Sequence, residues 1–306
     1  AEPELMVDVS SGTRARRAGI ITSVAGLWRS LDWPLRIAAA LLVLFVVVAL
    51  FGPWLTPYDP LTGSLRARLV PPAWQEGGSW AHPFGTDRLG RDILSRIIAG
   101  ARISLTVCAL VIAISGALGT AVGTAAGYFG GWTDRILMRL VDLALSFPVI
   151  LLALLLGAIS GPSFANIIIV ISLVLWSQYA RMARGETLKI RNEDYVDLAR
   201  TSGLSDWKII WRHILPNIAP ALIVVATLQV GVVIVLEASL SFLGVGVPPP
   251  APSWGSMVAD GRSYIASAWW LCIVPGTAIL LTVMAVNLVG DALADRINPA
   301  LRGRNI

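Results

Sequence analysis

The residue types that usually carry catalysis are scarce in this sequence. Its only lysines, Lys189 and Lys208, are not preceded by glycine, so neither completes the Gly-Lys-Ser/Thr sequence that holds nucleotide phosphates. Its only histidines, His82 and His213, are separated by three apolar segments, which excludes a His-Glu-x-x-His metal site on one helix. The sequence therefore predicts that this chain is neither an ATPase nor a hydrolase, and that it holds no metal or cofactor.

Polar side chains inside apolar segments are the remaining candidates for chemistry. Gln229 lies near the middle of the apolar run 218–236, and Glu237 follows its end. Polar groups are costly in a membrane, so these two side chains either line a translocation path or form interhelical hydrogen bonds; both alternatives stay open. Asp142 and Asn287 fall toward the ends of other runs, where structural hydrogen bonding or an interfacial location is favoured.

The composition places most of the chain in a lipid bilayer. Of the 306 residues, 56% are hydrophobic and 14% are charged, whereas soluble domains are usually about 25% charged. Pro148 and Pro275 fall inside two of the apolar runs and are expected to kink those helices. A spanning helix needs about 20 apolar residues. The sequence predicts an all-α integral membrane protein with six transmembrane helices, in the runs 35–51, 103–126, 136–159, 165–180, 218–236 and 269–288.

The distribution of positive charge predicts the orientation. With the N-terminus inside, the inner segments hold 17 of the 24 lysines and arginines, which agrees with the positive-inside rule. Both termini are then predicted to be cytoplasmic. The basic N-terminal segment lacks the order of regions that is typical of a signal peptide. Nucleic acid is not an expected partner. The predicted parts are a cytoplasmic segment 1–34, a first span 35–52, an outer loop 53–102, a five-helix core 103–290 with a cytoplasmic loop 181–217, and a cytoplasmic tail 291–306.

Small residues repeat at every fourth position of the second predicted span. Ser115, Gly119, Gly123 and Gly127 lie on one helical face. Such a stripe lets another helix approach closely. We expect the packing to be within this chain rather than with a partner.

The cytoplasmic loop 181–217 contains two amphipathic stripes at helical spacing. The first comprises Tyr195, Leu198, Ala199 and Ser202, and the second Trp207, Ile210, Trp211 and Ile214. Gly203 separates them, where a residue without Cβ lets one helix end and the next leave at an angle. Leu215 and Pro216 are expected to close the unit before the fifth span. Either lipid headgroups or a groove on a cytoplasmic partner protein could cover these stripes.

The sequence of this loop resembles a known family. From Glu193 it reads EDYVDLARTSGLSDWKIIWRHILPN, which resembles the EAA loop of bacterial ABC importer permeases. Leu198 departs from the pattern by replacing the usual first alanine. In that family the loop is the coupling helix seated on the ATPase subunit. The resemblance implies this role for Asp197, Ala199, Gly203, Ser205, Asp206, Trp207, Ile210, Trp211, Leu215 and Pro216.

Three further segments are similar to permeases of the dipeptide and oligopeptide importer group. They read HPFGTDRLGRDILSRIIAGARISL from His82, EASLSFLGVGVPPPAPSWG from Glu237, and GDALADRINPALR from Gly290. The resemblance covers the chain from Leu35 onward. It implies the type I importer architecture and the second permease subunit of a dipeptide system in a bacterial inner membrane.

The same resemblance implies the partners. They are a second permease that supplies the other half of the path, two ATPase subunits that bind ATP and Mg, and an extracytoplasmic substrate-binding protein. Related permeases also move nickel, glutathione or haem, so these remain alternative substrates. A stand-alone secondary transporter and a membrane scaffold are the rival interpretations; the small bundle and the absence of a visible inverted repeat count against the transporter.

The outer loop 53–102 is expected to contain a helix along the membrane interface. Thr86 or Asp87 can cap it, and its polar face would comprise Arg88, Arg91, Asp92 and Ser95, opposite Leu89, Ile93 and Ile97. The proline-rich run 248–252 favours an extended turn. Both segments are either plain loop architecture or a docking surface for a substrate-binding protein.

Overall fold

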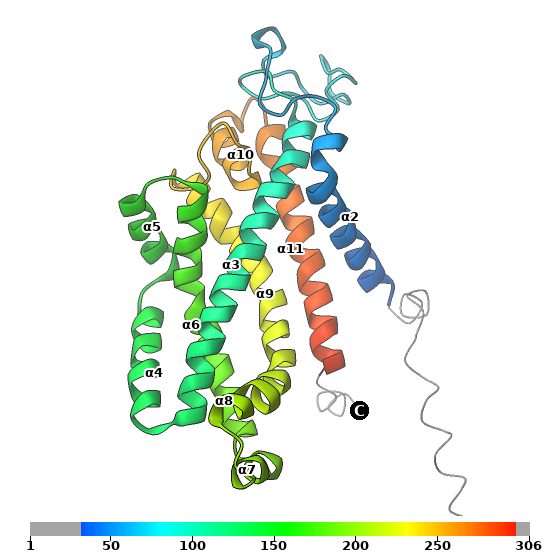
Figure 1. The fold of residues 1–306 in the computed structure, drawn as a ribbon. Coiled ribbons are helices and arrows are strands. Elements are labelled where there is room, and N and C mark those ends of the chain that lie inside the picture. Colours follow the sequence, from blue (N-terminus) through cyan, green and yellow to red (C-terminus); the bar gives the residue numbers. More distant parts are fainter. Residues whose placement is uncertain (1–31, 298–306) are drawn as a thin grey trace, which may run out of the picture.

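The computed structural model in Figure 1 describes residues 32–297, with side chains described as far as residue 293. In this part of the chain every named element is a helix, so the predicted all-α class is confirmed. The predicted N-terminal segment, apart from residues 32–34, and the last nine residues of the predicted tail lie outside the described residues. The helices are α2 (Trp33–Leu55), η2 (Leu65–Ala67), α3 (Ile93–Phe129), α4 (Gly131–Ser146), α5 (Val149–Ser160), α6 (Phe164–Ile190), α7 (Asp194–Thr201), α8 (Asp206–Ile209), the π-helical turn η3 (Ile210–Ile214), α9 (Leu215–Phe242), α10 (Trp254–Gly261), η4 (Arg262–Tyr264) and α11 (Trp270–Ile297).

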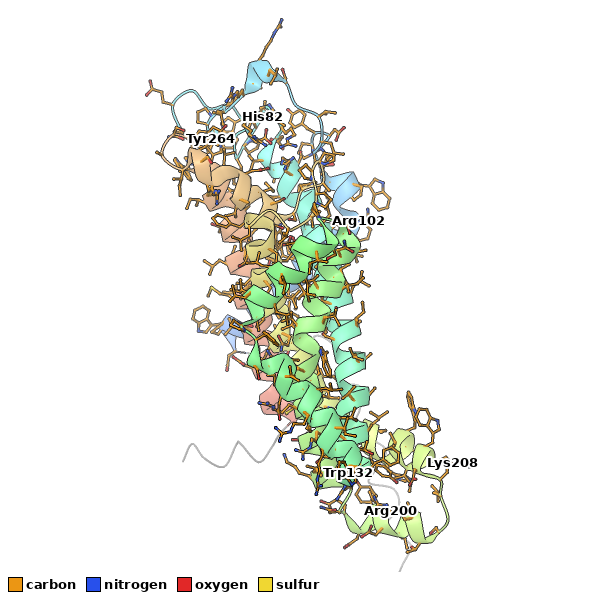
Figure 2. All side chains as sticks on the ribbon, turned by 90° about the vertical axis from the view of Figure 1, so that its left-hand side faces the viewer. His82, Arg102, Trp132, Arg200, Lys208 and Tyr264 are labelled. Carbon is orange, nitrogen blue, oxygen red and sulfur yellow. The ribbon has the colours of Figure 1, made fainter. Side chains whose placement is uncertain are left out.

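The long helices form an elongated up-and-down bundle (Figure 1). α2 begins and α11 ends toward the end that carries α7, here called the α7 end, whereas the loop between α2 and α3 lies with α10 at the opposite α10 end. α3, α6 and α9 share the central apolar core, which α5 also enters. Figure 2 shows His82 and Tyr264 at the α10 end and Arg200 and Lys208 at the α7 end.

Among residues 32–297, five helices are long and apolar enough to cross a membrane, and a sixth span is present there only if α4 and α5 count as one. These two helices are bent by 89° relative to each other, so the prediction of one kinked third span understated the break. Phe147 between them is extended, with ψ 137°, because the Pro148 ring disfavours a helical conformation in the preceding residue. Pro148 therefore ends one helix and begins another.

The second span begins at Ile93, earlier than predicted. The prediction of a separate interfacial helix that starts near Thr86 is wrong. Residues before Ile93 form a turn, in which the Asp87 carboxylate accepts hydrogen bonds from the backbone N–H groups of Leu89 and Arg91 at 2.8 and 2.9 Å. Gly90 has φ +71°, which a helix cannot accommodate. Asp92, rather than Thr86 or Asp87, caps α3 by accepting from the Ser95 N–H at 2.8 Å.

The fifth span also differs from its prediction. α8, η3 and α9 form one continuous helical run, Asp206–Phe242, so Leu215 and Pro216 do not close a separate unit. Pro216 lies inside this run, directly after the π-helical turn η3, and such a local change of helix type is one way in which a helix accommodates the missing N–H of a proline.

The stripe of small residues on α3 packs against α6 of the same chain. A Cβ at Gly123 would collide with the Ala180 carbonyl oxygen and would lie 2.8 Å from the Ala183 Cβ; a Cβ at Gly127 would lie 2.8 Å from the Thr187 Cβ. The backbones of α3 and α6 are therefore close enough that this face has room only for small residues.

Candidate functional site

The segment between α6 and α9 protrudes from the α7 end of the bundle (Figures 1 and 2). Val196 and Ala199 of α7 are buried against the start of the long α8–α9 run. Ile209, Ile214 and Ile218 of that run are fully buried in the same cluster. α7 is therefore held on the bundle by its own small apolar core rather than left as a loose loop.

Gly203 forms the joint between α7 and α8. Its φ is +78°, a conformation that L-residues with side chains rarely adopt. The Gly203 N–H donates to the Arg200 carbonyl at 3.0 Å, and the Leu204 N–H donates to the Ala199 carbonyl at 3.2 Å. These bonds satisfy the last carbonyls of α7 and turn the chain toward Ser205, which precedes α8.

Polar contacts tie this joint to the end of α3. The Tyr128 hydroxyl donates to an Asp206 carboxylate oxygen at 2.7 Å, and the Arg200 guanidinium lies 5.2 Å from the centre of the Tyr128 ring. Arg200 also bonds to Asp197 at 3.1 Å, although both side chains are largely exposed, so that pair adds little stability. A movement of α7 would therefore be transmitted to α3 as well as to α9.

The faces of the two stripes differ from the prediction. In the first, Tyr195, Leu198 and Ser202 are exposed, and Val196 joins Ala199 on the buried side. In the second, Ile210 and Ile214 are buried, whereas Trp207 and Trp211 are 67% and 57% exposed. Which face of so short a helix is buried depends on the element that packs against it, and the sequence does not identify that element.

The two tryptophans line an apolar hollow. Their ring centres lie 5.5 Å apart, edge to face, and a cavity of about 460 Å³ lies between them and α3. The lining of this cavity is mostly apolar, with Ala121, Ala125 and Phe129 of α3 beside the indoles, although Thr124 and Asp206 also line it. The α7 end therefore presents an exposed apolar surface next to the charged helix α7.

Gln229 forms an interhelical hydrogen bond. Its Nε2 donates to Oε1 of Gln178 on α6 at 2.5 Å, and its Oε1 has no partner among the described residues. Gln229 is buried, but Gln178 is exposed on the bundle surface. Sequence reasoning missed Gln178, whose only signal is its polarity near the end of the run 165–180.

The two glutamines provide a test that separates hydrogen bonding from path lining. We expect Gln178→Leu alone to destabilise the protein by about 0.6–2 kcal/mol, because the buried Gln229 amide then loses its only partner. The double change with Gln229→Leu should recover most of that loss. Thermal unfolding of the unaltered protein, the two single variants and the double variant measures the coupling between the two side chains. If the double variant is stable but its uptake falls, the pair lines the path; unchanged uptake indicates a structural bond only.

Glu237 of α9 is 2% exposed and faces α3 and the N-terminus of α10. Its Oε1 accepts from the Ser241 hydroxyl at 2.9 Å, and Ser104 and Ser253 also contact the carboxyl group. It is therefore enclosed by serines rather than open to a channel in this arrangement. Of the other two polar candidates, Asp142 pairs with Arg181 at 3.0 Å on the surface, whereas Asn287 is half-buried on α11 and lies against Gly231 of α9.

A second group of charged residues lies buried at the α10 end, and two of them, Arg91 and Asp92, were predicted on the polar face of a helix. Arg91, Arg96, Asp87 and Asp92 are all at most 7% exposed. The available signal was the Asp87–Arg91 spacing of four residues, but such spacing occurs equally in exposed helices. The compact turn around Gly90 is what buries these charges.

Comparisons with known proteins agree with this arrangement. Residues 119–303 match the family described as the binding-protein-dependent transport system inner membrane component, and residues 36–72 match the N-terminal transmembrane domain of oligopeptide transport permease C. The chain is 39% identical over 301 residues to the probable D,D-dipeptide transport system permease protein DdpC of Escherichia coli K12, covering 98% of this chain and 99% of that one. It is 46% identical over 260 residues to the dipeptide transport system permease protein DppC of the same strain, covering 85% and 87%.

Solved structures show the same fold at lower identity. An inward-facing structure of the MetNI methionine ABC transporter has a chain that matches with a TM-score of 0.56 and 17% identity, covering 67% of this chain and 98% of that chain. A crystal structure of an amino acid ABC transporter with histidines matches with a TM-score of 0.50 and 13% identity, covering 66% and 94%. The helical core thus has the same fold as chains of these two ABC transporters.

Proposed function

Because the chain belongs to the family of inner membrane components of binding-protein-dependent transport systems, we propose that it forms half of the translocation path of an ABC importer for dipeptides or short oligopeptides. The relatives named as dipeptide permeases support this substrate class, at 39% and 46% identity. A second permease chain would supply the other half, and a substrate-binding protein would deliver the cargo. Nickel, glutathione and haem remain the alternative cargoes.

The observation that carries the proposal is the α7–α8 unit with its exposed tryptophans. We infer that one of two partner ATPase subunits, which bind ATP and Mg, receives this unit on the cytoplasmic side. An exposed apolar surface of this kind marks an interaction site, and a groove that accepts a helix is a common way to cover it. Since α8 is continuous with α9 and Asp206 is bonded to α3, closure of the ATPases would tilt both spans.

Reconstitution tests the proposal. The chain, its partner permease, the ATPases and the binding protein are placed in proteoliposomes, and uptake of a labelled dipeptide is measured. We expect uptake that needs ATP and the binding protein. Transport by this chain alone, without any ATPase, would instead identify a secondary transporter.

The proposed orientation has its own test. Positive charges gather at the α7 end, which supports the proposal that this end and both termini lie in the cytoplasm. Gly77, exposed in the loop at the α10 end, should then be extracytoplasmic. A reporter enzyme that is active only outside the cytoplasm should be active when fused at Gly77. Activity of a cytoplasm-only reporter at the same position would invert the orientation.

A further inference from the structure

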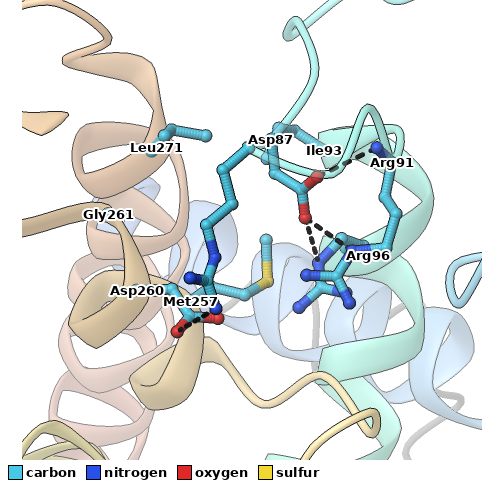
Figure 3. Close-up of a pocket in the computed structure, with 9 residues that line it drawn as sticks. Asp87, Arg91, Ile93, Arg96, Met257, Asp260, Gly261 and Leu271 are labelled. Carbon is cyan, nitrogen blue, oxygen red and sulfur yellow. Dashed lines mark hydrogen bonds and ion pairs between the residues drawn. The ribbon is translucent and has the colours of Figure 1, made fainter. Parts of the chain in front are cut away.

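Two buried arginines share one carboxylate at the α10 end (Figure 3). The Arg91 Nε donates to Oδ2 of Asp87 at 2.6 Å, and the Arg96 Nε lies 3.7 Å from the same oxygen. The other Asp87 oxygen already accepts two backbone N–H groups. The side chains of Arg91 and Arg96 are only 8% and 4% exposed, so bulk water screens them poorly.

The charges around this carboxylate do not balance. Arg88 lies 3.8 Å from Asp260, and both of these side chains are about half exposed. Asp92 is engaged elsewhere, since it bonds to His82 at 3.0 Å and caps α3. Two buried guanidinium groups therefore have one buried carboxylate between them. An excess buried charge is costly unless another group neutralises it.

A cavity of about 390 Å³ opens beside the excess charge. Arg88, Arg91 and Arg96 line one side, and the prolines 248–250 with Gly246 and Ser256 line the other. Its volume lies within the range of small-molecule sites. Among the bonds of the described residues, the Arg91 side chain uses only Nε, so its two terminal nitrogens remain as donors. Paired guanidinium donors suit the two oxygens of a carboxylate.

We propose that this cavity binds the terminal carboxylate of a peptide during its entry into the transporter. The inference rests on the proposed function in taking peptides as cargo. Three arginines and Asp260 line the cavity, and Asp87 lies behind the arginines. These three positive and two negative charges leave one net positive charge. That charge matches a single carboxylate, and the proline wall can contact the apolar part of a short peptide.

Ligand-induced stabilisation of the purified complete transporter, without its binding protein, tests the site directly. The probes are dialanine and dialanine amide, which differ only in the carboxylate. We expect dialanine to raise the melting temperature in a saturable way and the amide to have no such effect. Arg91→Gln should raise the half-saturating dialanine concentration about tenfold or more, as expected for loss of a charge-assisted hydrogen bond.

Two further variants separate binding from folding. Arg88→Gln removes a cavity-lining charge from a half-exposed side chain, so it should fold even if Arg91→Gln does not, and it should also weaken the dialanine response. Arg66→Gln is the matched control, because Arg66 is exposed in the same loop and does not line the cavity. Its response should equal that of the unaltered protein.

The outcomes that overturn the inference are distinct from those that overturn the proposed function. An equal response to the amide, or an unchanged response in both cavity variants, would refute the carboxylate site while ATP-dependent uptake still supports the transporter. Stabilisation by the binding protein but not by dialanine would assign the cavity to an acidic side chain of that protein and refute the peptide site. A saturable dialanine response without ATP-dependent uptake would support binding here and contradict the proposed function.

Discussion

Trp207→Asp is expected to abolish ATP-driven uptake without unfolding the permease. Trp207 is 67% exposed, so its replacement costs the isolated chain little. In the assembled transporter the new carboxylate would have to enter an apolar groove without a partner. Loss of a buried tryptophan anchor typically costs about 2 kcal/mol or more, which is roughly 30-fold in affinity. Co-purification of the ATPase subunits and uptake of dipeptide should therefore fall together.

Trp80→Asp is the matched control for this change. Trp80 is 81% exposed, comparable with Trp207, but it lies in the loop at the α10 end, away from the proposed ATPase surface. Its variant should retain the ATPases. Trp207→Phe should keep most of the uptake, because it preserves an aromatic surface. Normal ATPase retention and uptake in Trp207→Asp would show that lipid headgroups, rather than a partner, cover this surface.

The sequence was most informative where a local pattern determines the structure. Apolar runs predicted the spans because an apolar segment in lipid has to form a helix, which satisfies the backbone hydrogen bonds within the segment. Gly203 marked the joint between α7 and α8 because its positive φ is a local requirement. The four-residue spacing of Gly119, Gly123 and Gly127 likewise indicated a close helix contact, and the structure places that contact on α6.

Features that depend on distant neighbours were predicted poorly. Arg91 and Asp92 were predicted on the polar face of a helix, because nothing near them in the sequence shows that the compact turn around Gly90 buries them. Pro216 was predicted to end a unit, but it lies inside a continuous helical run next to a π-helical turn. Gln178 was passed over because its partner Gln229 lies 51 residues away.

Gly123→Ala is expected to destabilise the permease strongly for so small a change. The added methyl group would collide with the Ala180 carbonyl oxygen and would lie 2.8 Å from the Ala183 Cβ. The colliding oxygen belongs to the backbone of α6, so no side-chain rotation relieves the contact and the two helices must separate. Overpacking of this kind costs about 1–3 kcal/mol. The melting temperature of the purified transporter should fall, and its monodisperse fraction on size-exclusion chromatography should fall with it.

Gly185→Ala provides the same chemical change on the partner helix. Gly185 lies within α6, but a Cβ there meets no other atom within 4 Å. Alanine also favours the helix relative to glycine, by about 0.5–1 kcal/mol. This variant should therefore be as stable as the unaltered protein or slightly more stable. Equal melting temperatures for the two alanine variants would show that α3 and α6 are not in close contact at Gly123, and that the stripe faces another chain.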